Sequence, residues 1–527
     1  MHFLLSRIFG PLENNTTAFL VRSTAERWSK GSILAVDAGV HLAAIIQILE
    51  NTSGLGNVDG RNTIGASARE SEIGSFKESE SSHTSGHLKY TLACGPFQGM
   101  EVHHKSVKAV AGYIASVLVE TYLITHPHLD HIAGLIVNTA GLLGTRPKRI
   151  AGLPSTIDAL KEHIFNNVIW PNLSDESNGA GLITYLRLVE GGSPALDNGE
   201  GKGFVEVCEG LQVKTWCVSH GHCFEKHDHR GSITGISSIS ESPHRQVHNN
   251  STTGHSAAES SRRAWRDTTR DRVCVYDSSA HFIRDIATGR EILIFGDVEP
   301  DSISLWPRNR HVWSEAAPKI VAGKLKGIFI ECSYDDTRTV NILFGHLAPR
   351  YLIEEMKVLA TEVELLRTKE KRKRKRDSVS GAKQIRRKPQ SENTETAPSD
   401  LKPAENKPNG NSDRPIEGIS SLEELPLQDK DSLSDISNWP GDEPPLKSIK
   451  VIIIHIKERL EDGPNVADTI YNQLLEHEKQ AQLGCEFIIS SMGQSLESIS
   501  AASHKELTLD WRRTQSSIRG RWDEAVR

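Results

Sequence analysis

Short apolar runs recur along the chain, and each is followed by a polar residue able to bind a metal ion. The runs are 33–36 before Asp37, 117–124 before His126, 213–218 before His220, 292–295 before Asp297, 328–330 before Glu331 and 451–454 before His455. Runs of this length, bounded by polar turns, are typical of strands buried on both faces. Helical patterns lie between some of them, at 131–143, 155–165 and 348–366. The sequence therefore predicts a layered α/β fold, with the polar residues meeting along one edge of the sheets.

Four segments interrupt this pattern. Residues 51–85 and 225–270 are rich in small and polar residues, 369–446 opens with the basic run 371–376 and becomes rich in Pro, Ser and acidic residues, and 495–527 is polar and charged. Such segments cannot bury enough apolar surface to offset the entropy of ordering them. We expect one folded domain over 1–368 with flexible inserts near 51–85 and 225–270, a disordered insert over 369–446, the final strands of the same domain over 447–494, and a C-terminal segment over 495–527.

Composition narrows the classes of protein to consider. The 527 residues carry 62 Lys and Arg against 68 Asp and Glu, a net charge of −6, which argues against a surface that wraps nucleic acid. Every apolar run is far shorter than the roughly 18 residues that span a bilayer. The seven cysteines are scattered without a C-x-x-C pair, which favours a reducing compartment. We expect a cytoplasmic protein, with import into the nucleus through Lys371 to Arg376 as an alternative reading of a run that is otherwise a solvated charge cluster.

The densest group of candidate ligands is Thr125-His126-Pro127-His128-Leu129-Asp130-His131, between a predicted strand and a predicted helix. Imidazole nitrogen binds Zn²⁺ at about 2.0–2.1 Å and carboxylate oxygen at a similar distance, and this loop offers enough ligands for two ions. A solvent-exposed histidine loop is the alternative. It would require neither the preceding apolar strand nor the small Gly134 on the helix that follows, so the pattern favours a metal centre.

The motif His126-x-His128-Leu-Asp130-His131-Ile-Ala-Gly134 resembles the signature of the class II cyclic-nucleotide phosphodiesterases, found in fungi and some bacteria, within the metallo-β-lactamase superfamily. Other segments agree with that family: Asp37-Ala-Gly39, Val218-Ser-His220-Gly221, Phe295-Gly-Asp297-Val-Glu-Pro300, Glu331-Cys-Ser333-Tyr334, Leu343-Phe-Gly-His346 and Ile454-His455-Ile-Lys457. The resemblance covers nearly all of the chain outside the inserts. It implies a metallo-β-lactamase fold, an αββα sandwich. Two features depart from the family pattern, namely Thr139 in place of the usual Ser and an opening segment 1–10 without the usual Gly-rich strand and turn.

The resemblance also implies a set of metal ligands. One zinc ion would be held by His126, His128 and His220, the other by Asp130, His131 and His455, with Asp297 bridging both. Each remote ligand keeps an alternative interpretation: His220 as part of a surface histidine cluster, Asp297 as a turn-forming residue, and His455 as a satisfied core histidine.

Four further roles are expected around this centre. Asp37, at the end of the first apolar run, would accept hydrogen bonds from the metal loop and orient its imidazoles. Asp130 is expected to act in catalysis as well as in metal binding. Related tRNA 3′-end processing nucleases carry a Glu and a His near the reacting phosphate at corresponding places, and this resemblance implies that Glu331 would orient His346 and that His346 would stabilise or protonate the leaving oxygen. The alternative for the last two is a structural salt bridge and a helix cap.

The function implied by the resemblance is hydrolysis of 3′,5′-cyclic AMP, with cyclic GMP as a further candidate, to the 5′-monophosphate, which ends cyclic-nucleotide signalling. A metal-bound hydroxide would attack, because two zinc ions lower the pKa of bound water from about 15.7 toward ~7. Two rivals stay open: a tRNA 3′-end processing endonuclease of the same fold, and a non-catalytic scaffold with a structural metal site. The expected partner is the small-molecule substrate, without membrane or nucleic acid, and a homodimer remains open.

Overall fold

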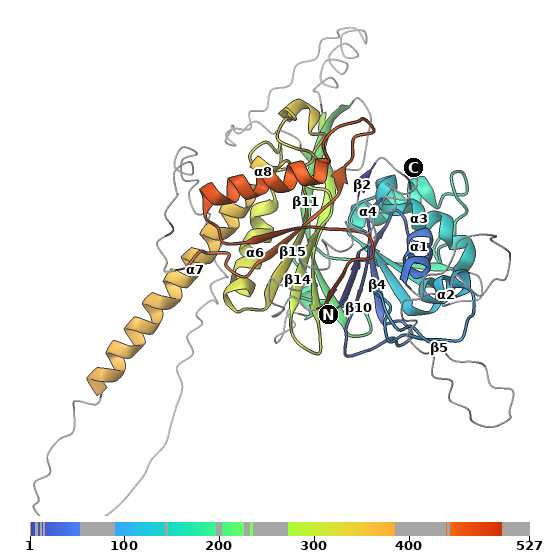
Figure 1. The fold of residues 1–527 in the computed structure, drawn as a ribbon, viewed down its shortest axis with the longest axis horizontal. Coiled ribbons are helices and arrows are strands. Elements are labelled where there is room, and N and C mark those ends of the chain that lie inside the picture. The colour runs from blue at the N-terminus through green and yellow to red at the C-terminus, as the bar shows by residue number, and fades with distance from the viewer. Residues whose placement is uncertain are drawn as a thin grey trace, which may run out of the picture.

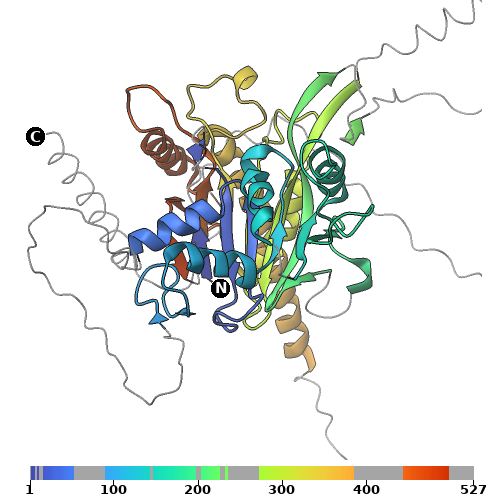
Figure 2. The ribbon, with the colours of Figure 1, turned by 90° about the vertical axis from the view of Figure 1, so that its right-hand side faces the viewer.

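Two β-sheets pack face to face with helices on both outer sides (Figures 1 and 2). The computed structural model describes residues 2–5, 9–10, 13, 16–52, 90–142, 146–196, 203–225, 232–234, 272–384, 439 and 443–497. The layered arrangement confirms the expected αββα sandwich.

The first sheet has seven strands in the order β19 (Ser495–Glu497), β1 (His2–Leu5), β3 (Ala18–Arg22), β4 (Ile33–Ala38), β7 (Val119–Leu123), β8 (Lys148–Gly152) and β9 (Ile183–Arg187). Strands β4, β7, β8 and β9 run parallel to one another. The helices that cover its outer face are α1 (Leu42–Thr52), α2 (Val107–Tyr113), α3 (Leu129–Asn138) and α4 (Pro154–Ala159).

The second sheet follows the order β10 (Val205–Cys208), β11 (Leu211–Glu225), β13 (Arg272–Asp285), β14 (Glu291–Phe295), β15 (Leu325–Glu331), β16 (Lys450–Ile454) and β18 (Glu486–Ile489), and β12 (Ser232–Thr234) pairs with β13. Strands β14, β15, β16 and β18 are parallel. Its outer face carries α6 (Asn309–Val321), α7 (Pro349–Gln384) and α8 (Val466–Ala481). Two small ladders, β2 (Phe9–Gly10) with β17 (Ile456–Lys457) and β5 (Tyr90–Thr91) with β6 (Glu101–Val102), lie outside the main sheets.

Alternating side chains divide the core into three layers. On β4, Leu34 and Val36 point between the sheets, whereas Ile33 and Ala35 point to the helices. On β16, Ile452 and Ile454 point between the sheets and their neighbours to the helices. Both faces of each central strand are thus buried, which is why these segments are almost continuously apolar. All six predicted strands are present.

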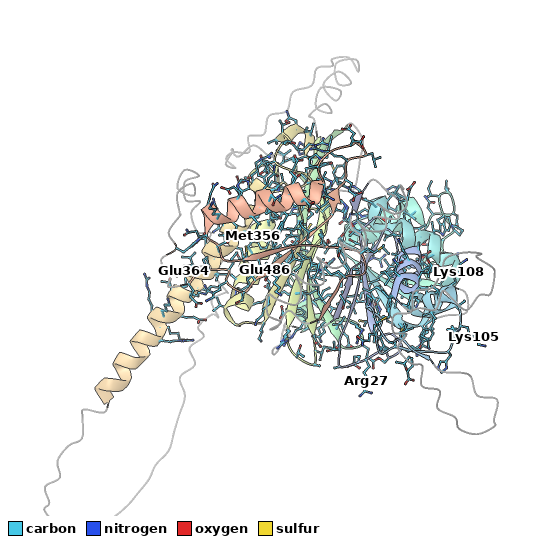
Figure 3. All side chains as sticks on the ribbon, viewed as in Figure 1. Arg27, Lys105, Lys108, Met356, Glu364 and Glu486 are labelled. Carbon is cyan, nitrogen blue, oxygen red and sulfur yellow. The ribbon has the colours of Figure 1, made fainter. Side chains whose placement is uncertain are left out.

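Helix α7 shows where the sequence pattern and the structure differ. Its first turns pack on the second sheet, and Met356 is fully buried there, whereas the later part leaves the core (Figures 1 and 3). The helix continues to Gln384, into the segment 369–446 that we expected to be unstructured. Lys, Arg and Glu are good helix formers, and extending a helix that is already nucleated costs little. Strand β12 likewise lies within the expected insert 225–270, and most of the remainder of the four interrupting segments lies outside the described residues.

The two departures from the family pattern have simple structural outcomes. Strand β1 is present and pairs with β3 and β19, so the opening segment does supply a strand. The Thr139 hydroxyl donates to the Ile136 carbonyl at 2.6 Å and accepts from the Trp170 indole at 3.0 Å. Threonine therefore retains the hydroxyl that serine would offer.

None of the helices in the described part of the chain combines the length and the apolar character needed to cross a membrane.

Glycine is required where α3 meets the end of β4. A Cβ at Gly134 would lie 2.8–2.9 Å from backbone atoms of Ala38, Gly39 and His41, and the Gly134 amide donates to the Gly39 carbonyl at 2.7 Å. This contact fixes α3 against the end of β4, the strand that carries Asp37.

Gly134→Ala should therefore lower the free energy of unfolding by ~1–3 kcal/mol, because the backbone atoms it meets cannot move aside freely. Gly112→Ala, in α2 with no atom within 4 Å of the added Cβ, is the matched control and should stabilise by up to about 1 kcal/mol. Urea unfolding of both variants measures this. Equal effects of the same sign would contradict the proposed close contact.

A buried histidine on β13 predicts a pH dependence of stability. His281 is fully buried and burial lowers its pKa to about 3. Between pH 6.5 and 3 the unfolded chain binds a proton that the folded chain does not, so the contribution of His281 to stability falls as the pH falls. From pH 7 to pH 5 the free energy of unfolding of His281→Leu should rise by about 2 kcal/mol relative to the parent protein. Urea unfolding at both pH values tests this, and a constant difference would show that His281 titrates alike in both states.

Candidate metal centre

The carboxyl ends of the parallel strands from both sheets meet at one edge of the sandwich. Asp37 lies one residue before the end of β4, His126 follows β7, Asp297 follows β14, Glu331 ends β15 and His455 follows β16. His220 differs from our expectation because it lies inside the long strand β11 rather than at a strand end. A register shift between Ser219 and His222, with Gly221 at a φ of +76°, turns its side chain into the site.

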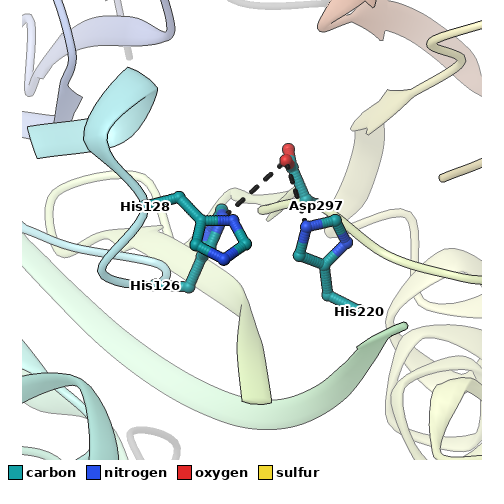
Figure 4. Close-up of side chains that lie close together, drawn as sticks. All are labelled: His126, His128, His220 and Asp297. Carbon is teal, nitrogen blue, oxygen red and sulfur yellow. Dashed lines mark hydrogen bonds and ion pairs between the residues drawn. The ribbon is translucent and has the colours of Figure 1, made fainter. Parts of the chain in front are cut away.

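The first group of possible ligands contains three histidines and one carboxylate (Figure 4). Nε2 of His126 and Nδ1 of His128 lie 3.0 Å apart. Asp297 Oδ2 lies 3.7 Å from His126 Nε2 and 3.6 Å from His220 Nε2. All four ligand atoms fall within 4.8 Å of one another.

The second group contains Asp130, His131, His455 and, again, Asp297. Nε2 of His131 and Nε2 of His455 are 3.3 Å apart, and His455 Nε2 lies 3.2 Å from Asp130 Oδ2. Asp297 Oδ1 lies 3.3 Å from His131 Nε2 and 3.4 Å from His455 Nδ1. Asp297 therefore presents one carboxylate oxygen to each group.

Burial sets the charge of these side chains. It lowers the pKa of His126 and His128, and it lowers the pKa of His220 to about 3, so these imidazoles are neutral at physiological pH. Burial alone would raise the pKa of Asp297, but the neighbouring His455 and His131 hold it well below its usual value. His131 differs: burial alone would lower its pKa, but the carboxylates of Asp297 and Asp37 raise it well above its usual value, so His131 holds a proton that a bound metal ion would displace.

Asp37 orients the histidine loop. Its carboxylate accepts the Thr125 amide at 2.8 Å and lies 2.8 Å from His131 Nδ1, which leaves Nε2 of His131 directed toward Asp297. Asp37 adopts a left-handed backbone conformation with φ of +53°, which is rare for a residue with a side chain. The hydrogen bonds to the loop hold it there.

His220 is oriented by a backbone contact between two glycines. A Cβ on Gly345 would lie 2.6 Å from the Gly221 amide nitrogen, so Gly345 leaves no room for a side chain, and a Cβ on Gly221 would lie 3.2 Å from the Gly345 Cα. His220 Nδ1 donates to the Gly345 carbonyl at 2.9 Å, which directs Nε2 toward Asp297. The same contact brings the His220 and His346 rings to a centroid distance of 4.8 Å.

Glu331 and His346 form a third group with His220 and Asp297. Glu331 Oε1 accepts the Val298 amide at 2.8 Å and lies 2.9 Å from His346 Nδ1. Glu331 accepts hydrogen bonds from the Val298 amide and the Ser333 hydroxyl, so we assign it as the acceptor from His346 as well. Nδ1 of His346 then carries the proton, and Nε2 is left for another partner. Burial, followed by the charge of Asp297, raises the pKa of Glu331 to about 7, and burial lowers the pKa of His346 to about 4.

Two residues at the site had been assigned no role from the sequence. The Ser333 hydroxyl contacts Glu331 Oε2 and lies 2.7 Å from the His455 carbonyl, so it links the ends of β15 and β16. Lys457 Nζ lies 3.2 Å from Asp130 Oδ2 and 3.3 Å from His455 Nε2. Ser333 lies two residues after Glu331, and Lys457 lies two residues after His455. In an extended chain, residues two apart point to the same side, and this spacing is the sequence signal that could have identified both.

The structure thus gathers all ten residues that the sequence singled out: Asp37, His126, His128, Asp130, His131, His220, Asp297, Glu331, His346 and His455. The two histidine and aspartate groups suit divalent metal ions, since imidazole and carboxylate are common ligands of such ions in proteins.

Comparisons with known proteins agree with this arrangement. The 3′,5′-cyclic-nucleotide phosphodiesterase of Schizosaccharomyces pombe is 27% identical over 355 residues, covering 67% of this chain and 73% of that protein. The 3′,5′-cyclic-nucleotide phosphodiesterase 1 of Saccharomyces cerevisiae is 28% identical over 360 residues, covering 67% and 80%. The crystal structure of unliganded yeast PDE1 superposes with a TM-score of 0.55 at 20% identity, over 94% of this chain and 98% of that one, and shares the fold.

The family match extends over more than half of the sequence. Residues 55–369 match the class-II cAMP phosphodiesterases. This range contains the histidine loop, His220, Asp297, Glu331 and His346. The chain, with its metallo-β-lactamase fold, belongs to the class-II cAMP phosphodiesterase family.

Proposed function

We propose that this protein hydrolyses 3′,5′-cyclic AMP to 5′-AMP at a centre of two zinc ions, and that cyclic GMP is a second substrate. The observation that carries the proposal is the position of Asp297, which offers one oxygen to each of two groups of ligands. We assign His126, His128 and His220 to one ion, Asp130, His131 and His455 to the other, and Asp297 as the bridge.

The donor set supports this assignment. Four ligands at about 2.0–2.1 Å in a tetrahedron lie roughly 3.3–3.5 Å from one another, and several nitrogen–oxygen separations in both groups fall near that range. When bound, two divalent ions activate water and stabilise the charge that develops on a phosphodiester. Asp130 shares the second group with His131 and His455, its carboxylate oxygen lies 3.2 Å from Lys457 Nζ, and we assign it to the catalytic set in addition to its role as a ligand.

His346 is the proposed proton donor to the leaving 3′-oxygen, and Glu331 positions it. Glu331 holds Nδ1, so Nε2 is the atom that would face the substrate. Burial keeps the imidazole neutral in the absence of substrate, whereas an anionic phosphodiester beside it favours the protonated form. The negative charge of the bound substrate would thus raise the pKa of His346, so that the imidazole takes up the proton that it needs in order to act as an acid.

The choice of substrate rests on the family and on the names of the relatives. The matched family is that of class-II cAMP phosphodiesterases, and the two yeast relatives are named as 3′,5′-cyclic-nucleotide phosphodiesterases. In that role the protein would end cyclic-nucleotide signals.

The proposed location is the cytoplasm, with the basic run 371–376 as a candidate nuclear import signal. The seven cysteines of the sequence form no C-x-x-C pair, which supports a reducing compartment. We expect neither a membrane nor a nucleic-acid partner.

The direct test is a product assay on purified, metal-analysed protein with 3′,5′-cyclic AMP, 2′,3′-cyclic AMP and a precursor tRNA. We expect 5′-AMP from the first substrate and two zinc ions per chain after reconstitution. Cleavage of the tRNA alone would support the nuclease rival. Two bound metals without turnover of any substrate would support a scaffold.

Asp37→Asn should lower zinc affinity ~10–100-fold, the usual effect of removing a group that orients a metal-binding histidine. The amide would present its NH₂ group to His131 Nδ1 and so favour the tautomer with the proton on Nε2. Competition titration with a zinc chelator measures the affinity. Asp285→Asn is the matched control: this buried carboxylate accepts the Ser23 hydroxyl at 3.0 Å, is no part of the site, and its loss should leave zinc affinity unchanged.

His346→Ala should lower kcat for cyclic AMP by ~10²–10⁴-fold, the usual range for a lost general acid, with both metals retained. A nitrophenyl phosphodiester has a leaving group that needs little protonation, so the same variant should lose much less activity on it. Steady-state kinetics on both substrates with parallel metal analysis tests this. Equal losses would indicate a role in positioning or folding, and no loss would leave His346 as a structural residue.

A further inference from the structure

A cavity of about 240 Å³ opens beside the metal centre. Its walls are the turn after β15, with Tyr334, Asp335 and Arg338, and the segment that leads from β17 to α8, with Lys457, Arg459 and Val466. Of the site residues discussed above, Lys457 lines this cavity. Its volume is suited to a ligand of the size of a nucleoside.

Two of the residues that line the cavity, Lys457 and Tyr334, also contact residues of the metal centre. Lys457 Nζ lies 3.2 Å from Asp130 Oδ2, so it stands at the boundary between the cavity and the second group of ligands. The Tyr334 ring meets the His346 ring edge to face at a centroid distance of 5.8 Å. A ligand whose phosphate lies at the metal centre can therefore extend directly into the cavity.

Arg338 carries a planar cation and lies on the turn after β15, which several hydrogen bonds and an ion pair hold in place. Its guanidinium lies over the Tyr334 ring, 4.9 Å from the centroid. Asp335 pairs with Arg459 at 2.6 Å rather than with Arg338, and Asp335 Oδ1 accepts the Thr337 amide at 2.9 Å. Arg350 donates to the Arg338 carbonyl at 2.6 Å. The turn is thus held by its own contacts, and the Arg338 guanidinium is available to a ligand in the cavity.

We propose that this cavity binds the nucleoside part of the cyclic nucleotide and that the Tyr334–Arg338 pair is the surface on which the purine base stacks. The inference rests on the proposed function. A guanidinium is weakly hydrated, flat and able to stack on aromatic rings, and a purine is such a ring. Lys457, between the base and the metal groups, adds positive charge for an anionic ligand. Arg338 is therefore a specificity-determining residue, and it takes no part in proton transfer.

The test compares cyclic AMP with bis(4-nitrophenyl) phosphate, a phosphodiester that lacks a nucleoside. Arg338→Ala should raise KM for cyclic AMP roughly 5- to 150-fold, the range expected for loss of one base-stacking contact, with kcat little changed. Its kinetics on the nitrophenyl diester should stay at the parent values, which also shows that the variant is folded and metal-loaded. Arg338→Lys should keep most of the increase in KM for cyclic AMP, because lysine retains the positive charge but has no planar group on which the base can stack.

Arg310→Ala is the matched control, since Arg310 is an exposed arginine on α6 that pairs with Glu362 at 3.4 Å. It should leave both substrates unaffected. A parent-like KM for cyclic AMP in Arg338→Ala, full rescue by lysine, or equal losses on both substrates would each overturn the subsite alone. Parent protein that cleaves the nitrophenyl diester and not cyclic AMP would overturn the proposed function, and the subsite with it.

Discussion

The carboxylate of Asp297 is buried among five imidazole rings, and the rest of the site is arranged around it. Its two oxygens lie 3.3–3.8 Å from nitrogens of His126, His131, His220, His346 and His455. A buried carboxylate is costly unless it is paired and hydrogen-bonded. The histidines come from both sheets. Because the buried Asp297 carboxylate needs these partners, it links the carboxyl ends of strands in one sheet to those in the other.

Local backbone strain accompanies this arrangement. Asp37 and His455 both have positive φ, at 53° and 57°; Asp37 contacts His131 of the second group of ligands, and His455 belongs to that group. Conformations of this kind cost of order 1–3 kcal/mol each and persist where surrounding contacts fix them. The tight packing of Gly134 on β4 and of Gly345 on Gly221 supplies such contacts. The site is thus held by backbone packing as well as by its side chains.

Two neighbouring parts of the centre have different chemistry. Glu331 and His346 form a buried carboxylate–imidazole pair whose remaining nitrogen is available to a substrate oxygen. Next to His346, the Tyr334–Arg338 pair and Lys457 line the cavity, together with the acidic Asp335 and Glu458. A phosphodiester between them would have its leaving oxygen near a proton donor and its organic group in a space shaped by flat side chains.

The sequence by itself determined six of the strands, the histidine loop and ten of the residues that meet at the site, but not Ser333 or Lys457. Those features are local: apolar runs report burial of a strand, and the spacing of His126, His128 and His131 places them around the start of α3, with His128 at its N-cap and His131 in its first turn. The family resemblance supplied the remote residues, because no local pattern connects His455 to a loop more than 300 positions earlier.

Only the tertiary structure decided how these residues meet. His131 and His455 are 324 positions apart and their ring nitrogens are 3.3 Å apart, a distance set by the packing of one sheet on the other. The bulge that turns His220 inward, the roles of Ser333 and Lys457, and the cavity beside Arg338 depend on the same packing. Periodicity in a sequence records which face of an element is buried, and it carries no information about which distant element covers that face.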